Sequence, residues 1–283
     1  MTKTKKSILI TGCSSGIGLA VALGLHKQGY QVIASARKST DVNKLKEQGL
    51  TALQLDLDDS QSIQTAFKKC LELTGGELYA LFNNGAYGQP GAVEDLTREV
   101  LRAQLETNLL GWHELTNLVI PLMRKQGYGR IIQNSSVLGI VAMPYRGAYN
   151  CSKFALEGLT DTLRLELQGS GIHISLIEPG PIRSKFRENG FKMWQKNIVP
   201  ENSFHAKTYQ SLAARLQTEG DAAPFTLDPE AVLKRVEHAL TSKRPKVRYY
   251  VTFPTYLFGY LKRLLSSRQL DNVLNKVSGG GKH

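Results

Sequence analysis

The sequence has 283 residues, of which 41% are hydrophobic, and a formal net charge of +12 at pH 7. A chain of this length can bury one large core, which favours a single α/β domain over residues 1–283. The three cysteines and six histidines lack the spacing of a disulfide framework or a metal site, so we expect neither. The first apolar run is too short for a signal peptide, which favours a cytoplasmic protein.

The first predicted elements are a buried strand and a helix joined by a glycine-rich turn. Residues 8–10 are apolar, and Gly12, Gly16 and Gly18 follow before a helical pattern that stops near Gly29. In a dinucleotide-binding fingerprint, such glycines let the backbone approach the diphosphate, and the helix N-terminus favours its charge. The spacing here is Gly-x-x-x-Gly-x-Gly. The alternative is a tight turn that binds no ligand.

The second predicted strand covers residues 31–36 and is followed by Arg37 and Lys38. An acid commonly stands about twenty residues beyond such glycines to bind a ribose 2′-hydroxyl, and this sequence has none there. Arginine suits a 2′-phosphate, because its guanidinium offers two donors in a fixed fork, and Ser14 could add a hydroxyl. The sequence therefore predicts NADP(H), although the two basic residues could also simply end the strand in solvent.

Later apolar runs continue the alternation of strands and helices. Their centres lie near Leu53, Leu81, Ile131 and Ile174. This alternation predicts a parallel sheet with helices on both faces.

A possible catalytic pair lies in a helical stretch beyond the middle of the chain. Tyr149 and Lys153 are four residues apart, and Ser136 stands thirteen residues before the tyrosine. Residues at i and i+4 share a helix face, so the lysine ammonium would lower the pKa of the phenol from about 10. The serine hydroxyl could hold a carbonyl oxygen for general acid–base catalysis. The alternative is that a half-buried tyrosine stands beside a solvated lysine and the pair has no catalytic role. Cys151, which lies between them in sequence, is interpreted as a packing residue.

From about Lys5 to Val251, the sequence resembles the short-chain dehydrogenase/reductase family. The matching features are the cofactor loop at residues 11–18, the adenine-side acid Asp56, the turn Asn83-Asn84-Gly85, Asn108, the group Ser136, Tyr149 and Lys153, and the turn Pro179-Gly180. The resemblance implies a single-domain Rossmann fold, with a doubly wound parallel sheet of about seven strands over residues 5–251. Within the family, the sequence is most similar to bacterial NADP(H)-dependent oxidoreductases allied to hydroxysteroid and retinol dehydrogenases.

The resemblance also implies a role for each site residue. Tyr149 would exchange a proton with the substrate, Lys153 would lower the tyrosine pKa and hold the nicotinamide ribose, Ser136 would position the substrate oxygen, and Asn108 would support a proton-relaying water. The expected cofactor-binding residues are Gly12, Ser14, Ser15, Gly16, Ile17, Gly18, Arg37, Asp56, Leu57, Asn83, Asn84, Gly85, Tyr149, Lys153, Pro179, Gly180 and Ile182.

One departure from the family pattern concerns the turn after Asn84. The order is Gly85-Ala86, whereas the family has alanine followed by glycine. If the second position needs a positive φ, Ala86 would be strained by about 1 to 3 kcal/mol.

Two later segments are expected to surround the core. Residues 181–228 contain several aromatic side chains and are interpreted as a long, irregular flap over an apolar substrate pocket, with about half of the aromatics anchoring it. The extension at residues 252–283 is basic: from Pro229 onward the chain has eleven Lys or Arg and three acidic residues. The uncharged stretch at residues 249–261 is too short to span a bilayer. It could rest on an anionic membrane at the inner face, or pack on its own domain or on a second subunit.

The predicted function is an NADPH-dependent carbonyl reductase, reversible as an alcohol dehydrogenase, acting on apolar aldehydes, ketones or steroid- and retinoid-like substrates. The alternatives are a ketoacyl-carrier-protein reductase and a non-catalytic NADP(H)-binding sensor. Nucleic-acid binding is not expected, because no recognised binding module accompanies the positive charge. Family likeness suggests a homodimer or homotetramer.

Overall fold

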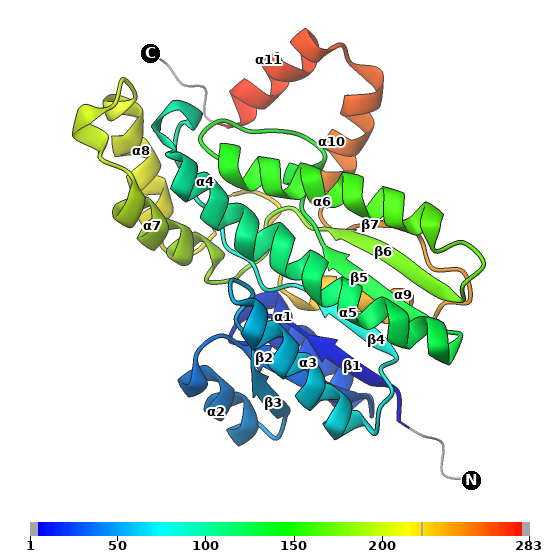
Figure 1. The fold of residues 1–283 in the computed structure, drawn as a ribbon. Helices are drawn as coiled ribbons and strands as arrows, with labels where there is room; N and C mark the ends of the chain where they lie inside the picture. Colours follow the sequence, from blue (N-terminus) through cyan, green and yellow to red (C-terminus); the bar gives the residue numbers. More distant parts are fainter. Residues whose placement is uncertain (1–4, 222, 279–283) are drawn as a thin grey trace.

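The strands of the sheet lie in the order β3-β2-β1-β4-β5-β6-β7, and all neighbouring pairs are parallel. The computed structural model describes residues 5–221 and 223–278 (Figure 1). Its strands are β1 (Ser7–Ile10), β2 (Gln31–Ala36), β3 (Thr51–Gln54), β4 (Ala80–Asn83), β5 (Gly129–Asn134), β6 (Ile172–Glu178) and β7 (Arg248–Tyr250). This arrangement confirms the predicted doubly wound parallel sheet.

Helices follow most strands and cover both faces of the sheet, as Figure 1 shows. The helices are α1 (Gly16–Lys27), α2 (Ser39–Glu47), α3 (Ser60–Thr74), α4 (Arg98–Leu105), α5 (Gly111–Gln126), α6 (Gly147–Glu166), α7 (Phe186–Asn197), α8 (Ala206–Gln217), α9 (Glu230–Thr241), α10 (Phe253–Leu264) and α11 (Ser267–Val277). Four short turns are η1 (Val93–Asp95), the π-helical η2 (Glu106–Leu110), η3 (Val137–Gly139) and η4 (Pro200–Asn202).

Two apolar cores hold these layers together. The central strands are buried on both faces, which is why their sequences are continuous apolar runs instead of alternating ones. On one face, α1, α2 and α9 pack on the sheet through residues such as Val21, Leu45 and Val236. On the other face, α3, α5 and α6 pack through residues such as Ile63 and Trp112. The sheet therefore supplies a rigid edge on which a site can be built.

The strand order reverses direction between β1 and β4, which are neighbours although two strands separate them in the chain. In open parallel sheets, ligands bind in the crevice outside the carboxyl ends of the strands at such a reversal. Here the glycine-rich turn after β1 and the turn after β4 meet at that point.

The segment at residues 181–228 is not irregular, as the sequence pattern suggested, because it contains α7 and α8. These helices form a separate lobe at the upper left of Figure 1. Aromatic packing stabilises the lobe: the Trp194 ring lies 5.9 Å from the rings of both Phe191 and Tyr209, and Tyr209 is buried. These three aromatics anchor the lobe, whereas Phe225 remains exposed.

The C-terminal segment adds β7 to the sheet edge and then forms two successive helices, α10 and α11, orange to red in Figure 1. Tyr249, Val251 and Phe258 are buried, so a large part of the stretch at residues 249–261 packs on its own domain. Within the part of the chain that the structure describes, no helix is both long and apolar enough to cross a membrane. The last part of the predicted basic extension, residues 279–283, lies outside the described residues.

Candidate active site

Close backbone contacts explain two of the three glycines after β1. Gly12 has a φ of +71°, and a Cβ atom there would lie 2.4 Å from the Cα of Gly85 in the turn after β4. A Cβ atom at Gly18 would lie 2.3 Å from the carbonyl oxygen of Gly12. Larger residues at these two positions would push the first turn of α1 away from the strand ends.

The N-terminus of α1 is suited to an anion. Ser15 is its N-cap residue but makes no side-chain cap hydrogen bond, and the first turn contains no acidic residue. The N–H groups of a first helical turn lack partners inside the helix and carry a partial positive charge. The position therefore has the donors and the charge that a diphosphate would need.

A hydrogen-bonded group of polar residues locks the turns after β1, β4 and β5 together. The Thr11 hydroxyl accepts hydrogen bonds from the backbone N–H groups of Asn84 at 2.8 Å and Gly85 at 2.9 Å. The Asn84 amide donates to the Thr11 carbonyl at 3.0 Å and accepts from the Asn134 side chain at 2.9 Å. Thr11 and Asn134 were not among the predicted site residues, although Thr11 stands in the matched loop.

Asn83 is placed differently from the other predicted cofactor residues. It is fully buried, and its amide donates to Thr116 on α5 at 3.0 Å and to Gln133 on β5 at 2.9 Å. The side chain therefore joins a strand to its neighbours and does not face the edge where the glycine turns meet. The possible strain at Ala86 is also absent, because Ala86 is not among the described non-glycine residues with positive φ.

The adenine side of the expected cofactor site lies around β2 and β3. Arg37 is exposed directly after β2, and its main-chain carbonyl accepts a hydrogen bond from Gln54. Burial raises the pKa of Tyr87 to about 12, and the Arg37 charge acts in the opposite direction, which puts the guanidinium within electrostatic reach of that phenol. Among the residues that the structure describes, the exposed Arg37 guanidinium forms no ion pair.

The remaining predicted residues of this side lie close by. The Asp56 carboxylate accepts a hydrogen bond from the Asp58 backbone N–H at 3.2 Å, and Leu57 packs against the positions of Gly85 and Gly111. Ser14 is exposed, and Ile17 is half-buried on α1.

The catalytic side chains predicted from the sequence come together beyond β5. Ser136 is the N-cap residue of η3, and its hydroxyl accepts a hydrogen bond from the Leu138 N–H at 3.1 Å. Tyr149 and Lys153 lie one turn apart on α6, and both are buried. Ser136 lies close enough to the Tyr149 phenol to lower its pKa. Cys151 is exposed, so its interpretation as a packing residue was wrong.

The position of Lys153 corrects the expected electrostatics. Its ammonium donates to the Asn134 carbonyl at 2.8 Å and lies 4.3 Å from the centre of the Trp112 ring, but 5.6 Å from the centre of the Tyr149 ring. Burial raises the pKa of the Tyr149 phenol well above its usual value, and the hydrogen bond from Ser136 opposes this only in part. Burial also lowers the pKa of Lys153 to about 7, against the attraction of Glu157. Lys153 is not among the causes of the shift in the Tyr149 pKa, so the expected lowering of the tyrosine pKa by the lysine is not found in this structure.

Asn108 lies in the π-helical turn η2 between α4 and α5, and it is fully buried. Its amide donates to the Tyr87 carbonyl at 2.8 Å and to the Ser152 hydroxyl at 3.3 Å, and it accepts from the Tyr87 N–H at 3.1 Å. The Asn108 side chain thus joins the turn after β4 to α6. Single π-helical turns are frequently found at functional sites.

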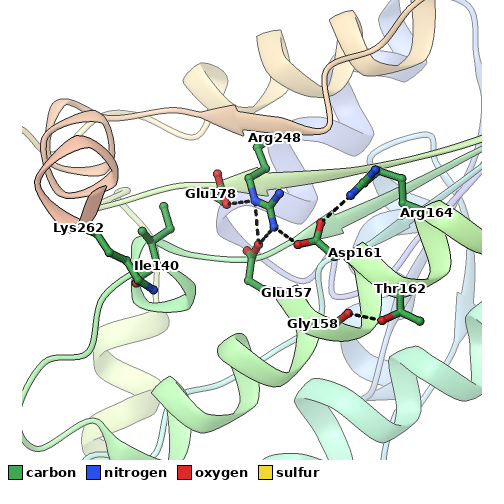
Figure 2. A network of polar contacts seen from close by, with 9 residues as sticks. All are labelled: Ile140, Glu157, Gly158, Asp161, Thr162, Arg164, Glu178, Arg248 and Lys262. Carbon is green, nitrogen blue, oxygen red and sulfur yellow. Dashed lines mark hydrogen bonds and ion pairs between the residues drawn. The ribbon is translucent and has the colours of Figure 1, made fainter. Parts of the chain in front are cut away.

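Behind Lys153, a group of charged residues connects α6 with β6 and β7. Figure 2 shows the Arg248 guanidinium between three carboxylates, with distances of 3.0 Å to Glu157, 2.7 Å to Asp161 and 3.2 Å to Glu178. Burial raises the pKa of Glu178 to about 9, and the nearby Glu157 adds to this effect. The sequence did not reveal this group, because its members are far apart in the chain.

The surroundings of the Tyr149 phenol are apolar. The Phe186 ring at the start of α7 meets the Tyr149 ring edge-on, with 5.2 Å between their centres. A Cβ atom at Gly88 would lie 2.9 Å from Phe186, so this glycine makes room for the ring. The predicted turn residues lie nearby in the chain: the Pro179 carbonyl accepts from the Val137 N–H at 2.8 Å, Gly180 packs on Thr252, and Ile182 forms a bridge with Leu227.

Comparisons with known proteins agree with this geometry. The sequence pattern described as short chain dehydrogenase matches residues 6–194. The chain is 44% identical over 270 residues to the uncharacterized oxidoreductase YbbO of Escherichia coli (strain K12), and the match covers 95% of this chain and 94% of that protein. It is 36% identical over 264 residues to human retinol dehydrogenase 8, covering 88% and 82%.

Solved structures show the same fold. A short-chain dehydrogenase from Streptomyces avermitilis superimposes with a TM-score of 0.76 and 26% identity, covering 100% of both chains. A variant of the actinorhodin polyketide ketoreductase with NADPH has a TM-score of 0.70 and 25% identity, covering 89% of this chain and 97% of that one. The chain therefore belongs to the short-chain dehydrogenase/reductase family of oxidoreductases, which confirms the family predicted from its motifs.

Proposed function

We propose that the protein is an NADP(H)-dependent oxidoreductase that interconverts an apolar carbonyl compound and its alcohol. The observation that carries the proposal is the buried phenol of Tyr149, which has Ser136 beside it, Lys153 one helical turn away and an apolar ring above it. This group lies next to the edge where the glycine-rich turns of β1 and β4 meet, because Gly88, soon after β4, approaches the Tyr149 ring.

The chain's own residues account for the proton in such a reaction. The raised pKa of Tyr149 keeps its phenol protonated near neutral pH, which is the state needed to donate a proton to a carbonyl oxygen during reduction. Ser136 would orient that oxygen through its hydroxyl. Lys153, with a pKa of about 7, can exchange a proton near neutral pH. The nicotinamide supplies or accepts the hydride when it is bound.

The proposed choice of NADP(H) rests on Arg37. It is exposed at the end of β2, where a 2′-phosphate would lie, and no carboxylate stands beside it in sequence. Similarity to the ketoreductase with NADPH supports the same choice. The cofactor-binding roles of Ser14, Asp56, Pro179 and Ile182 belong to this proposal. Asn83 is proposed only to support the turn that follows it.

The proposed substrate class is apolar. Phe186 from the lobe of α7 and α8 covers the Tyr149 ring, and several of the chain's relatives are named as steroid or retinol dehydrogenases. A carrier-bound thioester would be the preferred substrate if the chain were a ketoacyl-carrier-protein reductase. A sensor would bind NADPH without turning over any carbonyl compound.

The proposed location is the cytoplasm, and the proposed assembly is a homodimer or homotetramer. Support for assembly comes from α6, where Leu159 and Leu165 are exposed. A cavity of about 200 Å³ between α5 and α6 is lined in part by Leu109, Leu159 and Leu163.

The test is a screen of NADPH oxidation over apolar aldehydes, ketones, steroids and retinoids, with each positive repeated using NADH. The proposal expects turnover of at least one apolar carbonyl compound that is lost in Tyr149→Phe. Binding of NADPH without turnover of any compound would instead identify a sensor, and turnover restricted to carrier-bound thioesters would identify the rival reductase.

A further inference from the structure

Helix α10 has an apolar stripe on its outer side. Large apolar side chains recur there at intervals of three or four residues, and between 38% and 78% of each is exposed to solvent. The stripe consists of Phe253, Tyr256, Leu257, Tyr260 and Leu264. A helix in a water-soluble domain ordinarily presents polar residues on its outer face, so this stripe needs a partner.

The opposite side of α10 already has its partner, which is the domain itself. Phe258 is buried in an apolar cluster with Val137, Leu138 and Tyr149, and Leu261 packs against the same cluster. The Lys262 ammonium donates to the Ile140 carbonyl, as Figure 2 shows, and lies 4.8 Å from the centre of the Phe154 ring. The helix is therefore held in one orientation, and the stripe is fixed outward.

The stripe continues beyond α10 at its N-terminal end. Phe225, from the loop before α9, lies with its ring centre 4.8 Å from that of Phe253, and both side chains are more than half exposed. Two segments that are distant in sequence thus contribute aromatic side chains to one surface. Phenylalanine and tyrosine are suited to the boundary between lipid headgroups and acyl chains.

The charges around the stripe decide between two partners, a second copy of the chain and a lipid surface. Helix α10 contains no acidic residue, and Arg263 follows Tyr260 by three positions, which places it along the stripe. Helix α11 adds exposed Arg268 and Lys276 and has Asp271 as its acid. A second copy would bring the same cations to the contact, whereas an anionic lipid surface would attract them.

We infer that α10 docks the protein on the surface of an anionic bilayer, with its apolar stripe at the level of the headgroups. The inference does not depend on the reaction proposed above. It differs from the expectation drawn from the sequence, because Tyr249, Val251 and Phe258 face the core and Leu264 extends the stripe beyond residues 249–261. Since α10 and Tyr149 contribute to one apolar cluster, docking would bring the catalytic side of the domain near the lipid.

The test measures co-sedimentation of the full chain with vesicles at low salt. Vesicles that contain phosphatidylglycerol and phosphatidylcholine should bind at least about tenfold more protein than vesicles of phosphatidylcholine alone, because each basic residue near an anionic surface adds to binding. Added salt should release the protein, since charge attraction at a surface is screened. The variant Tyr260→Ser with Leu264→Ser should reduce binding at least about tenfold by removing apolar contact. The variant Val93→Ser with Val199→Ser removes two exposed apolar side chains elsewhere and should bind like the wild type.

Light scattering of the same variants gives the result that would overturn the inference. If the α10 double variant becomes a smaller oligomer while its vesicle binding stays unchanged, then the stripe is a contact between copies. Sedimentation of the wild type that is equal with and without anionic vesicles would also reject docking on lipid. Circular dichroism shows whether the variants keep their fold, which is expected because the replaced side chains are exposed.

Discussion

The Lys153 ammonium donates a hydrogen bond of 2.8 Å to the main-chain carbonyl of Asn134, the last residue of β5. The side chain of Asn134 in turn donates a hydrogen bond to the Asn84 side chain in the turn after β4. A side chain of the candidate site on α6 is thereby connected to the end of β5 and to the turn after β4. This contact keeps the lysine buried, and burial has a measurable effect on stability.

Lys153→Met should stabilise the folded chain at low pH. Burial lowers the folded-state pKa of Lys153 to about 7, whereas an unfolded lysine titrates near about 10, so the buried charge destabilises the fold most below pH 7. This destabilisation disappears as the pH rises from about 7 to about 10, where the folded chain has lost the proton. The free energy of unfolding of the variant, measured by urea denaturation, should exceed that of the wild type by about 2 to 5 kcal/mol near pH 6 and by less near pH 9.

The control for this measurement is Lys125→Met, which replaces an exposed lysine on α5 and should change stability little at either pH. Lys153→Met should also lose activity. Equal stability of wild type and Lys153→Met at both pH values would mean that the ammonium is not desolvated.

Tyr149→Phe should reduce turnover at least about a hundredfold, because it keeps the ring and removes the proton donor. The contact with Phe186 involves the ring, so the apolar surroundings should survive the change. Steady-state kinetics and NADPH binding by fluorescence should be measured together, with binding unchanged. Tyr145→Phe, four residues earlier, is the matched control and should keep most of the activity. Half of the wild-type turnover in Tyr149→Phe would remove this residue from the mechanism.

Arg37 should set the choice of cofactor. One charged hydrogen bond to the 2′-phosphate should give the wild type at least about a tenfold preference for NADPH over NADH in kcat/KM. Arg37→Asp should reverse the preference, because a carboxylate repels the phosphate and can accept the 2′-hydroxyl. The acid is introduced at position 37 and not at position 36, because Ala36 is buried and a charge there would disrupt the core.

Lys46→Asp makes the same change of charge on the exposed surface of α2 and should leave the preference intact. A wild type that uses both cofactors equally well would show that Arg37 merely ends a strand.

Arg248→Met should destabilise the protein by about 3 to 5 kcal/mol, because it leaves the buried carboxyls of Glu157 and Glu178 without their cation. Without Arg248, the folded-state pKa values of these carboxyls rise further above the unfolded values, so the folded chain binds more protons. The stability of the variant should therefore fall as the pH rises. Its loss of stability relative to the wild type should be larger at about pH 9 than at about pH 5. Arg164→Met removes a partner of Asp161 alone and should change the free energy of unfolding by less than about 1 kcal/mol. Similar losses in both variants would show that Arg248 has no special role.

Phe258→Ala should destabilise the fold by about 3 to 5 kcal/mol, because it opens a cavity in the cluster that joins α10 to η3. Tyr260→Ala, on the exposed side of the same helix, should change stability by less than about 0.5 kcal/mol. Thermal and urea denaturation of both variants would check this difference. A Phe258→Ala protein as stable as the wild type would mean that α10 is not part of the folded unit.

The sequence predicted the parts of the site that depend on local patterns. Strand, glycine turn and helix are close in the chain, and Gly12 and Gly18 are needed where backbones touch, so spacing alone located them. Tyr149 and Lys153 share a helix turn for the same reason. The direction of the Asn83 side chain could not be predicted, because it depends on Thr116 and Gln133 in other elements.

Other features depend on burial or on contacts between distant residues. The shift in the pKa of Lys153 follows from complete desolvation, which no sequence motif reports. Arg248 meets Glu157 across 91 positions of the chain, so local periodicity carries no sign of it. Helices α7 and α8 were missed because the sequence was interpreted through its aromatic content, whereas those aromatics pack on one another between the two helices.

The carboxyls of Glu157 and Glu178 belong to segments that the ribosome makes well before Arg248 emerges. Until β7 pairs with β6, the carboxyls of Glu157 and Glu178 lack the cation that pairs with them in the folded chain. The electrostatic environment of α6 and β6 is therefore completed by a residue that is made after both of them. A nascent chain cannot acquire its final electrostatic environment around Lys153 before β7 has joined the sheet.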